Sequence, residues 1–333
     1  MTRSSDNTVR VGSGDFIYEV FDDWGELPKG WELLDVGDIA VDSQDRVYVL
    51  NRGGHPVIVF DQAGQFIKSW GEGEFTRPHG ICIGPDDAIY TADDLDHTVR
   101  EFSPEGQLLM TLGTKGVPSD TGCLDRDYRT IKRGGPPFHM PTGVALSPNG
   151  ELYVSDGYGN ARVHKFSSDG ELLISWGEPG TGPGEFNLPH NISISQDGRV
   201  YVADRQNSRV QVFTLEGKFI TQWTDVSRPC GLKIDTEQYV YVAEVGMRYG
   251  IMKGMLSPTA DSQWSRVSVF DLEGNLLARW GEPDVSQAGN FVAAHAICID
   301  GRGDVYVGEV LNAATKGDPP AGSSVLHKFI RVR

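Results

Sequence analysis

The chain repeats one pattern six times, and this repetition limits the possible folds more than any other feature. Each copy contains an aliphatic residue, a tyrosine and then valine or threonine, at Tyr48, Tyr90, Tyr153, Tyr201, Tyr241 and Tyr306. Successive tyrosines are 42, 63, 48, 40 and 65 residues apart, so the shortest copies set the unit and the others carry insertions. A period in this range indicates a solenoid, a propeller or a similar array.

Within each copy, short runs of β-branched and aromatic residues alternate with turns rich in glycine, aspartate and asparagine. The third run of each copy ends in phenylalanine, at Phe60, Phe102, Phe166, Phe213, Phe270 and Phe329. The fourth run ends in tryptophan at Trp70, Trp176, Trp223 and Trp280. These runs predict antiparallel strands joined by hairpins. Four strands in each of six units predict an all-β fold, the six-bladed β-propeller.

The last copy has no fourth run of its own, whereas an unassigned run of that type extends from Phe16 to Gly25. We therefore expect an N-terminal strand to complete the last blade and close the ring. The expected single domain spans 1–333, with a closing strand at about 16–25 and blades at about 31–75, 76–113, 140–186, 187–224, 227–291 and 292–333.

The formal net charge of −16 and the scattered lysines and arginines argue against nucleic acid as a partner. Met1–Asp15 lacks the apolar core of a signal peptide, and no apolar run is long enough to span a membrane, so no membrane association is expected. The four cysteines lack metal-knuckle spacing and are expected to be reduced core thiols of a cytoplasmic protein. The oligomeric state is left open.

One repeat position holds three of the eight histidines. Eleven residues before each tyrosine stand Gly37, His79, Thr142, His190, Cys230 and His295. The histidines occur in alternate copies, so in a closed ring of six they lie about 120° apart and their imidazoles can converge on the axis. Three nitrogen ligands with an open side are typical of a catalytic zinc site, although iron(II), cobalt or manganese also suit imidazole.

Polar residues also recur directly after the second run. Three residues past the tyrosines stand Asn51, Asp93, Asp156, Asp204, Glu244 and Glu309, which we expect to cap the following loop through its backbone N–H groups. Because strands of a blade alternate in direction, these loops share a face with the histidines, and so do the insertions Gly113–His139, Val245–Trp264 and Leu311–Ser323.

The next positions on that face carry candidate catalytic groups. Arg52 and Arg205 suggest an anionic substrate, because a guanidinium binds a carboxylate through two hydrogen bonds. Tyr158, after the flexible Gly157, offers a phenol that can act as a base. The alternatives are arginines paired with the recurring acids and an exposed loop tyrosine.

Four segments resemble a known family: Pro78-His79-Gly80, the stretch Val154–Arg162, Leu188-Pro189-His190 and Val202–Arg205. They are similar to the peptidyl-α-hydroxyglycine α-amidating lyases, six-bladed propellers of NHL repeats, over about Val36 to Phe329. The resemblance implies that zinc is bound by His79, His190 and His295. It also implies Tyr158 as the base, with Arg52 and Arg205 holding the substrate carboxylate and Arg52 taking part in catalysis.

The resemblance has limits. The chain reads Ala293-Ala294-His295-Ala296 where the family has Met-Pro-His-Asp, so the family's calcium aspartate is missing at Ala296 and calcium is doubtful. We therefore predict a metal-dependent lyase that cleaves a small carboxylated carbinolamine, such as an N-acyl-α-hydroxyglycine, to an amide and glyoxylate. Two alternatives remain open: a metal-dependent hydrolase or lactonase on the same scaffold, and a non-catalytic NHL propeller that binds a protein.

Overall fold

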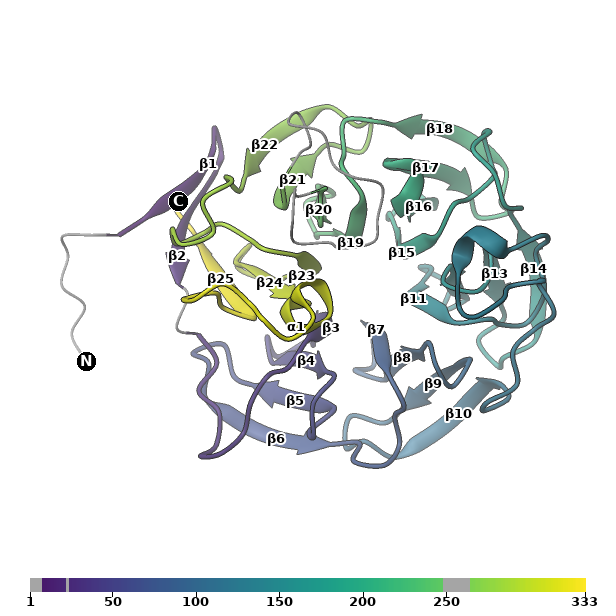
Figure 1. The fold of residues 1–333 in the computed structure, drawn as a ribbon, viewed down its shortest axis with the longest axis horizontal. Coiled ribbons are helices and arrows are strands. Elements are labelled where there is room, and N and C mark those ends of the chain that lie inside the picture. The colour runs from purple at the N-terminus through teal and green to yellow at the C-terminus, as the bar shows by residue number, and fades with distance from the viewer. Residues whose placement is uncertain (1–7, 22–23, 248–263) are drawn as a thin grey trace.

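Six antiparallel sheets surround a central axis, and the first strand of each is innermost (Figure 1). The computed structural model describes residues 8–21, 24–247 and 264–333. It confirms the predicted six-bladed propeller. Runs of valine, isoleucine and tyrosine form the inner strands because their branched and aromatic side chains pack well on a sheet that is covered on both faces.

The first three blades after the closing segment have four strands each. They are β3 (Val36–Val41), β4 (Val47–Asn51), β5 (Val57–Phe60) and β6 (Phe66–Trp70); β7 (Pro78–Ile83), β8 (Ile89–Asp93), β9 (Thr98–Phe102) and β10 (Leu108–Gly113); and β11 (Pro141–Leu146), β12 (Leu152–Asp156), β13 (Arg162–Phe166) and β14 (Leu172–Trp176).

The remaining strands continue the series. They are β15 (Pro189–Ile194), β16 (Arg199–Asp204), β17 (Arg209–Thr214) and β18 (Phe219–Trp223); β19 (Pro229–Ile234), β20 (Val240–Glu244), β21 (Arg266–Phe270) and β22 (Leu276–Trp280); and β23 (Ala294–Ile299), β24 (Val305–Glu309) and β25 (Leu326–Arg331). The described helices are short: η1 (Tyr128–Thr130), η2 (Arg205–Asn207) and α1 (Leu311–Thr315).

The N-terminal segment closes the ring as predicted. Strand β2 (Phe16–Phe21) pairs antiparallel with β25 and supplies the fourth strand of the last blade. An additional strand, β1 (Arg10–Ser13), pairs with β2 and makes this sheet five-stranded, which the repeat pattern did not indicate. Strand β2 ends at Phe21, before the expected Trp24, but Trp24 packs on Phe60 and Tyr306, with ring centroids 5.3 and 4.9 Å apart.

A shared aromatic contact joins neighbouring blades. The tryptophan that ends one blade packs on the phenylalanine of the next, in the pairs Trp70–Phe102, Trp176–Phe213, Trp223–Phe270 and Trp280–Phe329. The glycine of the following hairpin lies under the same indole: a Cβ on Gly217, whose φ is +75°, would come within 2.7 Å of Trp176. The repeated tryptophan, glycine and phenylalanine thus belong to the interfaces between blades.

The central channel contains an ion pair that links three blades. Lys233 Nζ lies 3.4 Å from Asp38 Oδ2 and donates to the carbonyl oxygen of Ile81 at 2.9 Å. Asp38 is 1% exposed, so Lys233 rather than water offsets its charge.

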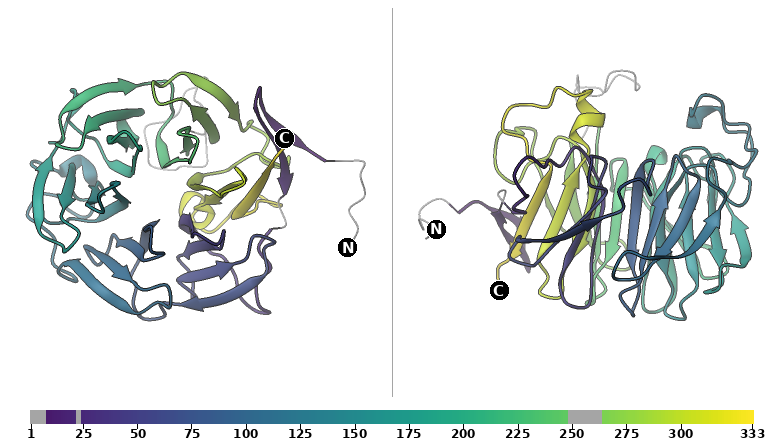
Figure 2. Two further views of the ribbon diagram at one scale, coloured as in Figure 1. Left: turned by 180° about the vertical axis from the view of Figure 1, so that it is seen from behind. Right: turned by 90° about the horizontal axis from the view of Figure 1, so that it is seen from below.

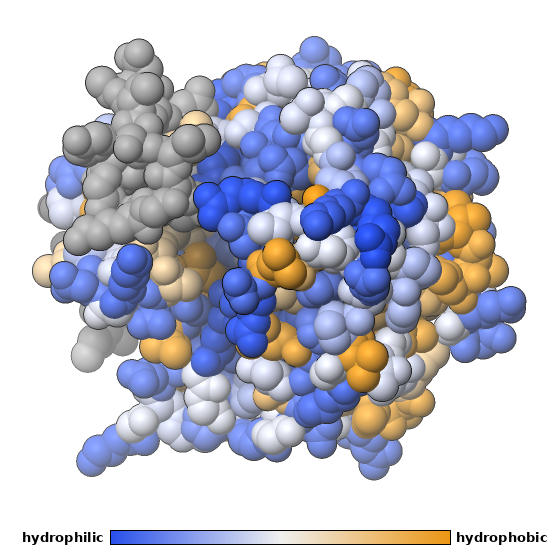
Figure 3. Space-filling model, turned by 45° about the vertical axis from the view of Figure 1, so that its right-hand side comes forward, coloured by the Kyte–Doolittle hydropathy of each residue, from blue (hydrophilic) through white to orange (hydrophobic). Residues whose placement is uncertain are grey.

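At the circumference the fourth strands expose large apolar side chains, among them Leu108, Leu109, Leu172, Leu173, Ile174, Phe219 and Ile220. Figure 3 shows hydrophobic side chains gathered along the right-hand edge of that view. Among the described residues, no helix has the length and apolar character needed to cross a membrane.

Candidate metal centre

A β-bulge interrupts the innermost strand of every blade at the same place. In β7, Pro78 pairs with Asp93 and Gly80 with the adjacent Ala92, so His79 has no partner on β8. The equivalent unpaired residues are Gly37, Thr142, His190, Cys230 and His295. A bulge breaks the in-and-out alternation of a strand and can re-aim one side chain. The repeat position found in the sequence is therefore the bulge position.

The three bulge histidines converge. Their ring centroids are 4.7, 4.8 and 5.1 Å apart, and one ligand nitrogen from each lies within 4.8 Å of those of the other two. All three are buried, with exposed fractions of 1% for His79 and His190 and 4% for His295. The structure thus brings together the residues that the alternating repeat selected.

The other three bulge positions orient these imidazoles. Nδ1 of His79 lies 2.7 Å from the carbonyl oxygen of Thr142, and Nδ1 of His190 lies 3.1 Å from that of Cys230. Nδ1 of His295 lies 2.9 Å from the carbonyl oxygen of Gly37. Each histidine therefore donates from Nδ1 to the next bulge around the ring, which leaves the lone pair of each imidazole on Nε2.

The electrostatic surroundings keep the imidazoles neutral. Burial lowers the pKa of each histidine well below its usual value. The charge of Arg52 lowers the pKa of His79 and His295 further, and Arg205 does so for His190. Neutral imidazole is the form that binds a metal. Three neutral nitrogens with fixed tautomers fit a divalent transition ion with one side left open.

Tyr158 lies on that open side. Its Oη is 3.3 Å from Nε2 of His79 and 3.1 Å from Nε2 of His190, and Nη1 of Arg205 donates to it at 3.3 Å. The guanidiniums of Arg205 and Arg77 lie 5.3 and 5.4 Å from the centroid of its ring. Sequence reasoning missed Arg77, although its place two residues before His79 was a usable signal.

Two arginines present unused donors here. Arg205 is 8% exposed, and its Nε is buried with no acceptor among the described residues. Nη2 of Arg52 is buried in the same way, while its Nε makes one long contact, 3.4 Å, with the carbonyl oxygen of Pro78. Buried charged donors are normally satisfied, so the pair is suited to receive an anion such as a carboxylate.

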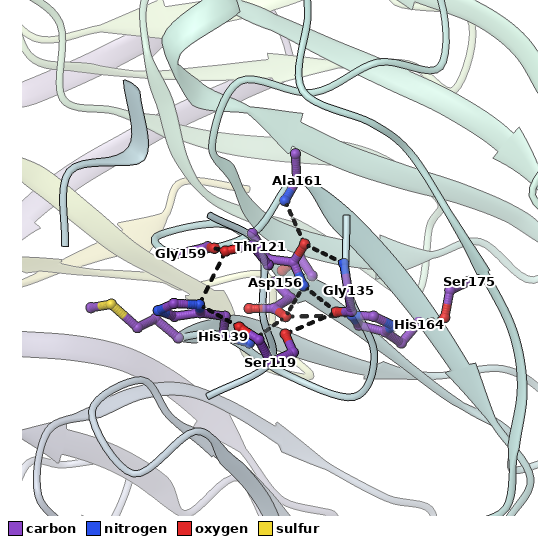
Figure 4. A network of polar contacts seen from close by, with 12 residues as sticks. Ser119, Thr121, Gly135, His139, Asp156, Gly159, Ala161, His164 and Ser175 are labelled. Carbon is purple, nitrogen blue, oxygen red and sulfur yellow. Dashed lines mark hydrogen bonds and ion pairs between the residues drawn. The ribbon is translucent and has the colours of Figure 1, made fainter. Parts of the chain in front are cut away.

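A polar network holds the loop that carries Tyr158 (Figure 4). Thr121 donates through Oγ1 to the carbonyl oxygen of Gly159 at 2.6 Å, and the Gly159 N–H donates to the carbonyl oxygen of His139 at 3.0 Å. Oδ2 of Asp156 accepts from the His139 N–H at 2.8 Å and from Nδ2 of Asn160 at 2.7 Å. The inserted segment 113–139 thus fixes the tyrosine from outside the blade.

The recurring acids are structural, as expected, but they mostly cap a different loop. Asp93 accepts from the backbone N–H groups of Thr76 and Arg77, and Asp204 accepts from that of Asn187. These donors lead into the first strand of the blade, not away from the second. Asp93 also accepts from Leu95 and Asp96, which lie in the loop that was predicted. A carboxylate at the end of the second strand, or the amide oxygen of Asn51 in the first blade, therefore holds the segment before the bulge.

The insertions rise from the histidine face. Figure 2 shows α1 and the teal segment that contains η1 above the same side of the ring. Helix α1 belongs to the predicted insertion Leu311–Ser323, and the Asn312 N–H donates to Oδ1 of Asp35 at 2.8 Å. Most of the predicted insertion Val245–Trp264 lies outside the described residues.

Residues 145–275 match a family model described as a 6-bladed beta-propeller. NHL repeat-containing protein 3 of Mus musculus is 31% identical over 274 residues, which cover 77% of this chain and 75% of that protein. Peptidyl-alpha-hydroxyglycine alpha-amidating lyase 1 of Drosophila melanogaster is 29% identical over 265 residues, which cover 74% of this chain and 45% of that protein.

Among solved structures, a gluconolactonase from Xanthomonas campestris is similar with a TM-score of 0.59, over 98% of this chain and 95% of that chain. Its sequence identity is 12%, so this likeness shows the fold alone.

Proposed function

The chain belongs to the family of NHL-repeat propellers that includes NHL repeat-containing protein 3 and the peptidyl-α-hydroxyglycine α-amidating lyases, and from this premise we propose that it is a metal-dependent lyase. Its substrate is a small carboxylated carbinolamine such as an N-acyl-α-hydroxyglycine, and its products are a primary amide and glyoxylate. One observation carries the proposal: three histidine nitrogens converge, the hydroxyl of Tyr158 contacts two of them, and two arginines with unused buried donors lie beside it.

His79, His190 and His295 would hold the metal ion through Nε2, with zinc as the first choice and iron(II), cobalt or manganese as alternatives. When bound, such an ion supplies a Lewis acid that polarises a substrate oxygen. The three backbone carbonyls on Nδ1 fix the rings, so the site needs little rearrangement to receive the ion. We do not include calcium in the proposal, because Ala296 stands where the family has its calcium-binding aspartate.

Tyr158, in its phenolate form, is the proposed base. It takes the proton of the substrate hydroxyl, the O–H electron pair becomes the second bond of the glyoxylate carbonyl, and the C–N bond breaks. The electron pair of that bond passes to the amide nitrogen, which receives the proton back from Tyr158. The hydrogen bond from Arg205 to Oη would stabilise the negative charge of the phenolate before it takes the proton and after it returns it.

Arg52 and Arg205 are proposed to bind the substrate carboxylate. Their unused donors belong to two blades, since Arg52 follows β4 and Arg205 follows β16, so a carboxylate between them would be held across the mouth of the site. We extend the proposal to a cytoplasmic location, because the four cysteines are free thiols.

The first test is the metal content of protein purified without chelator, measured by elemental mass spectrometry. We expect about one transition metal ion per chain, lost in the His79→Ala/His190→Ala double variant and retained in His55→Ala, a histidine outside the centre. Absence of a transition metal even after reconstitution would contradict the proposal and favour a non-catalytic propeller.

The reaction class is tested by product analysis in ¹⁸O-labelled water. A lyase releases amide and glyoxylate, and neither product gains solvent oxygen during bond cleavage once exchange of glyoxylate with water is subtracted. Incorporation of solvent oxygen at the cleaved bond would instead identify a hydrolase or lactonase.

A further inference from the structure

Arg77 is held in one orientation by a buried carboxylate. Its Nε donates to both oxygens of Asp94, at 2.7 and 2.9 Å, and its Nη2 donates to Oδ2 at 2.6 Å. The Asp94 side chain is 0% exposed, so bulk water does not compete with Arg77 for its oxygens. A fork of this kind fixes the plane of a guanidinium as well as its place.

The fork uses one edge of the guanidinium and leaves the other unused. Nη1 of Arg77 donates to no residue that the structure describes, and it is not among the buried donors without a partner. The side chain is 34% exposed, and its guanidinium lies 5.4 Å from the centroid of the Tyr158 ring. Arg77 therefore presents free N–H groups to open space beside the proposed base.

The proposed reaction has a position for such a donor. Arg52 and Arg205 account for the carboxylate, and Tyr158 accounts for the hydroxyl. The remaining acceptor on an N-acyl-α-hydroxyglycine is the acyl oxygen, which gains negative charge as the C–N bond breaks. Fixed donors aimed at a developing charge stabilise a transition state because they need no reorganisation at the moment of reaction.

We propose that Arg77 is a further catalytic residue that donates from Nη1 to the acyl oxygen of the departing amide. This inference rests on the proposed lyase function. The electron pair of the C–N bond is shared between the amide nitrogen and that oxygen, the nitrogen then takes the proton held by Tyr158, and Arg77 stays protonated throughout. Asp94 is a positioning residue that acts through Arg77.

The test is the dependence of the rate on the leaving amide, using N-benzoyl-α-hydroxyglycines with para substituents from methoxy to nitro. In the wild type the rate should depend weakly on the substituent, because Arg77 carries part of the charge. In Arg77→Met we expect kcat for the methoxy substrate to fall about 100-fold, the usual effect of losing one such donor. The loss should be clearly smaller for the nitro substrate, because the electron-withdrawing nitro group itself stabilises the negative charge that develops on the leaving amide.

Two further variants separate chemistry from folding. Arg77→Met leaves the Asp94 carboxylate buried without its cation, so the double variant Arg77→Met/Asp94→Asn removes both charges and should show the same steeper dependence. Arg77→Lys should restore part of the rate, since an ammonium keeps the charge but not the fork. Metal content should stay unchanged in every variant.

The matched control is Arg199→Met/Asp197→Asn. Nε of Arg199 donates to Asp197 at 2.8 Å, and its guanidinium lies 5.9 Å from the Tyr201 ring, but the pair lies where the turn after β15 enters β16, on the opposite face. This variant should keep wild-type kcat and substituent dependence.

Other outcomes would overturn the inference in recognisable ways. A fall in kcat that is equal for every substituent would make Arg77 a residue that only positions Tyr158. A rise in KM alone would indicate that Arg77 binds the substrate carboxylate and does not stabilise the leaving amide. If the wild type cleaves none of these substrates although it binds the metal, the lyase proposal itself fails, and this inference fails with it.

Discussion

His79 and Thr142 occupy the same bulge position in neighbouring blades, and Nδ1 of the histidine lies 2.7 Å from the carbonyl oxygen of the threonine. The pairs His190–Cys230 and His295–Gly37 repeat this arrangement around the ring. Each histidine thus donates a hydrogen bond to the backbone of a bulge that carries another residue type. The six bulge positions therefore alternate between a histidine and the carbonyl oxygen that orients it.

The histidine centre should keep its metal in mildly acidic solution. A histidine ligand is displaced by protons only near or below its own pKa, and the pKa of all three ligands is lowered in the folded protein. Metal content measured after dialysis at pH 7.5 and at pH 6.0 should therefore be the same. Release between these values would show that the imidazoles titrate like exposed ones.

Removal of the Tyr158 hydroxyl should stop catalysis without emptying the site. In Tyr158→Phe the ring can still pack against Arg77 and Arg205, but no base remains, so kcat should fall by about 100-fold or more. Steady-state kinetics and elemental analysis of the same sample check both parts. Unchanged kcat would place the base elsewhere.

Loss of the Arg52 guanidinium should act mainly on KM. A hydrogen bond to a charged group contributes about 1.5–3 kcal/mol, so Arg52→Met should raise KM by about tenfold or more. Arg10→Met, at an arginine whose side chain is 60% exposed and pairs with Glu19, is the control and should leave KM unchanged. An unchanged KM in Arg52→Met would exclude this residue from carboxylate binding.

The network around Thr121 should link stability to activity. Thr121→Val removes the donor to the Gly159 carbonyl oxygen from a fully buried position, at a cost of about 1–3 kcal/mol in the free energy of unfolding. Chemical denaturation measures this loss, and kcat should also fall because the Tyr158 loop loosens. Thr221→Val, on the exposed strand β18, should change neither quantity.

The sequence predicted what repeats and missed what differs between copies. Tyrosine and phenylalanine recur in the same order in every copy, and counting back from the tyrosines was enough to predict six blades and the histidine triad. The fork between Arg77 and Asp94 occurs in one blade, and its partners are brought together only by the fold. Strand β1 was missed for a similar reason: it adds a fifth strand to the outer edge of one sheet, and the repeat has no equivalent position.

The direction of capping by the recurring acids was also beyond sequence reasoning. Asp204 is three residues past a tyrosine, and the loop that follows it is near in sequence, whereas its partner Asn187 is seventeen residues earlier. Only the antiparallel pairing of β15 with β16 places that earlier loop beside the carboxylate. Local sequence distance was a poor guide because the hairpin doubles the chain back.

The pairing of β2 with β25 also imposes an order in time. During synthesis β2 emerges before β3 to β24, and its partner β25 follows all of these strands. The third imidazole, His295, belongs to that same last blade. A nascent chain in which only the first five blades have been synthesised contains two of the three histidine ligands. All three can therefore bind the ion only after the last blade has been made.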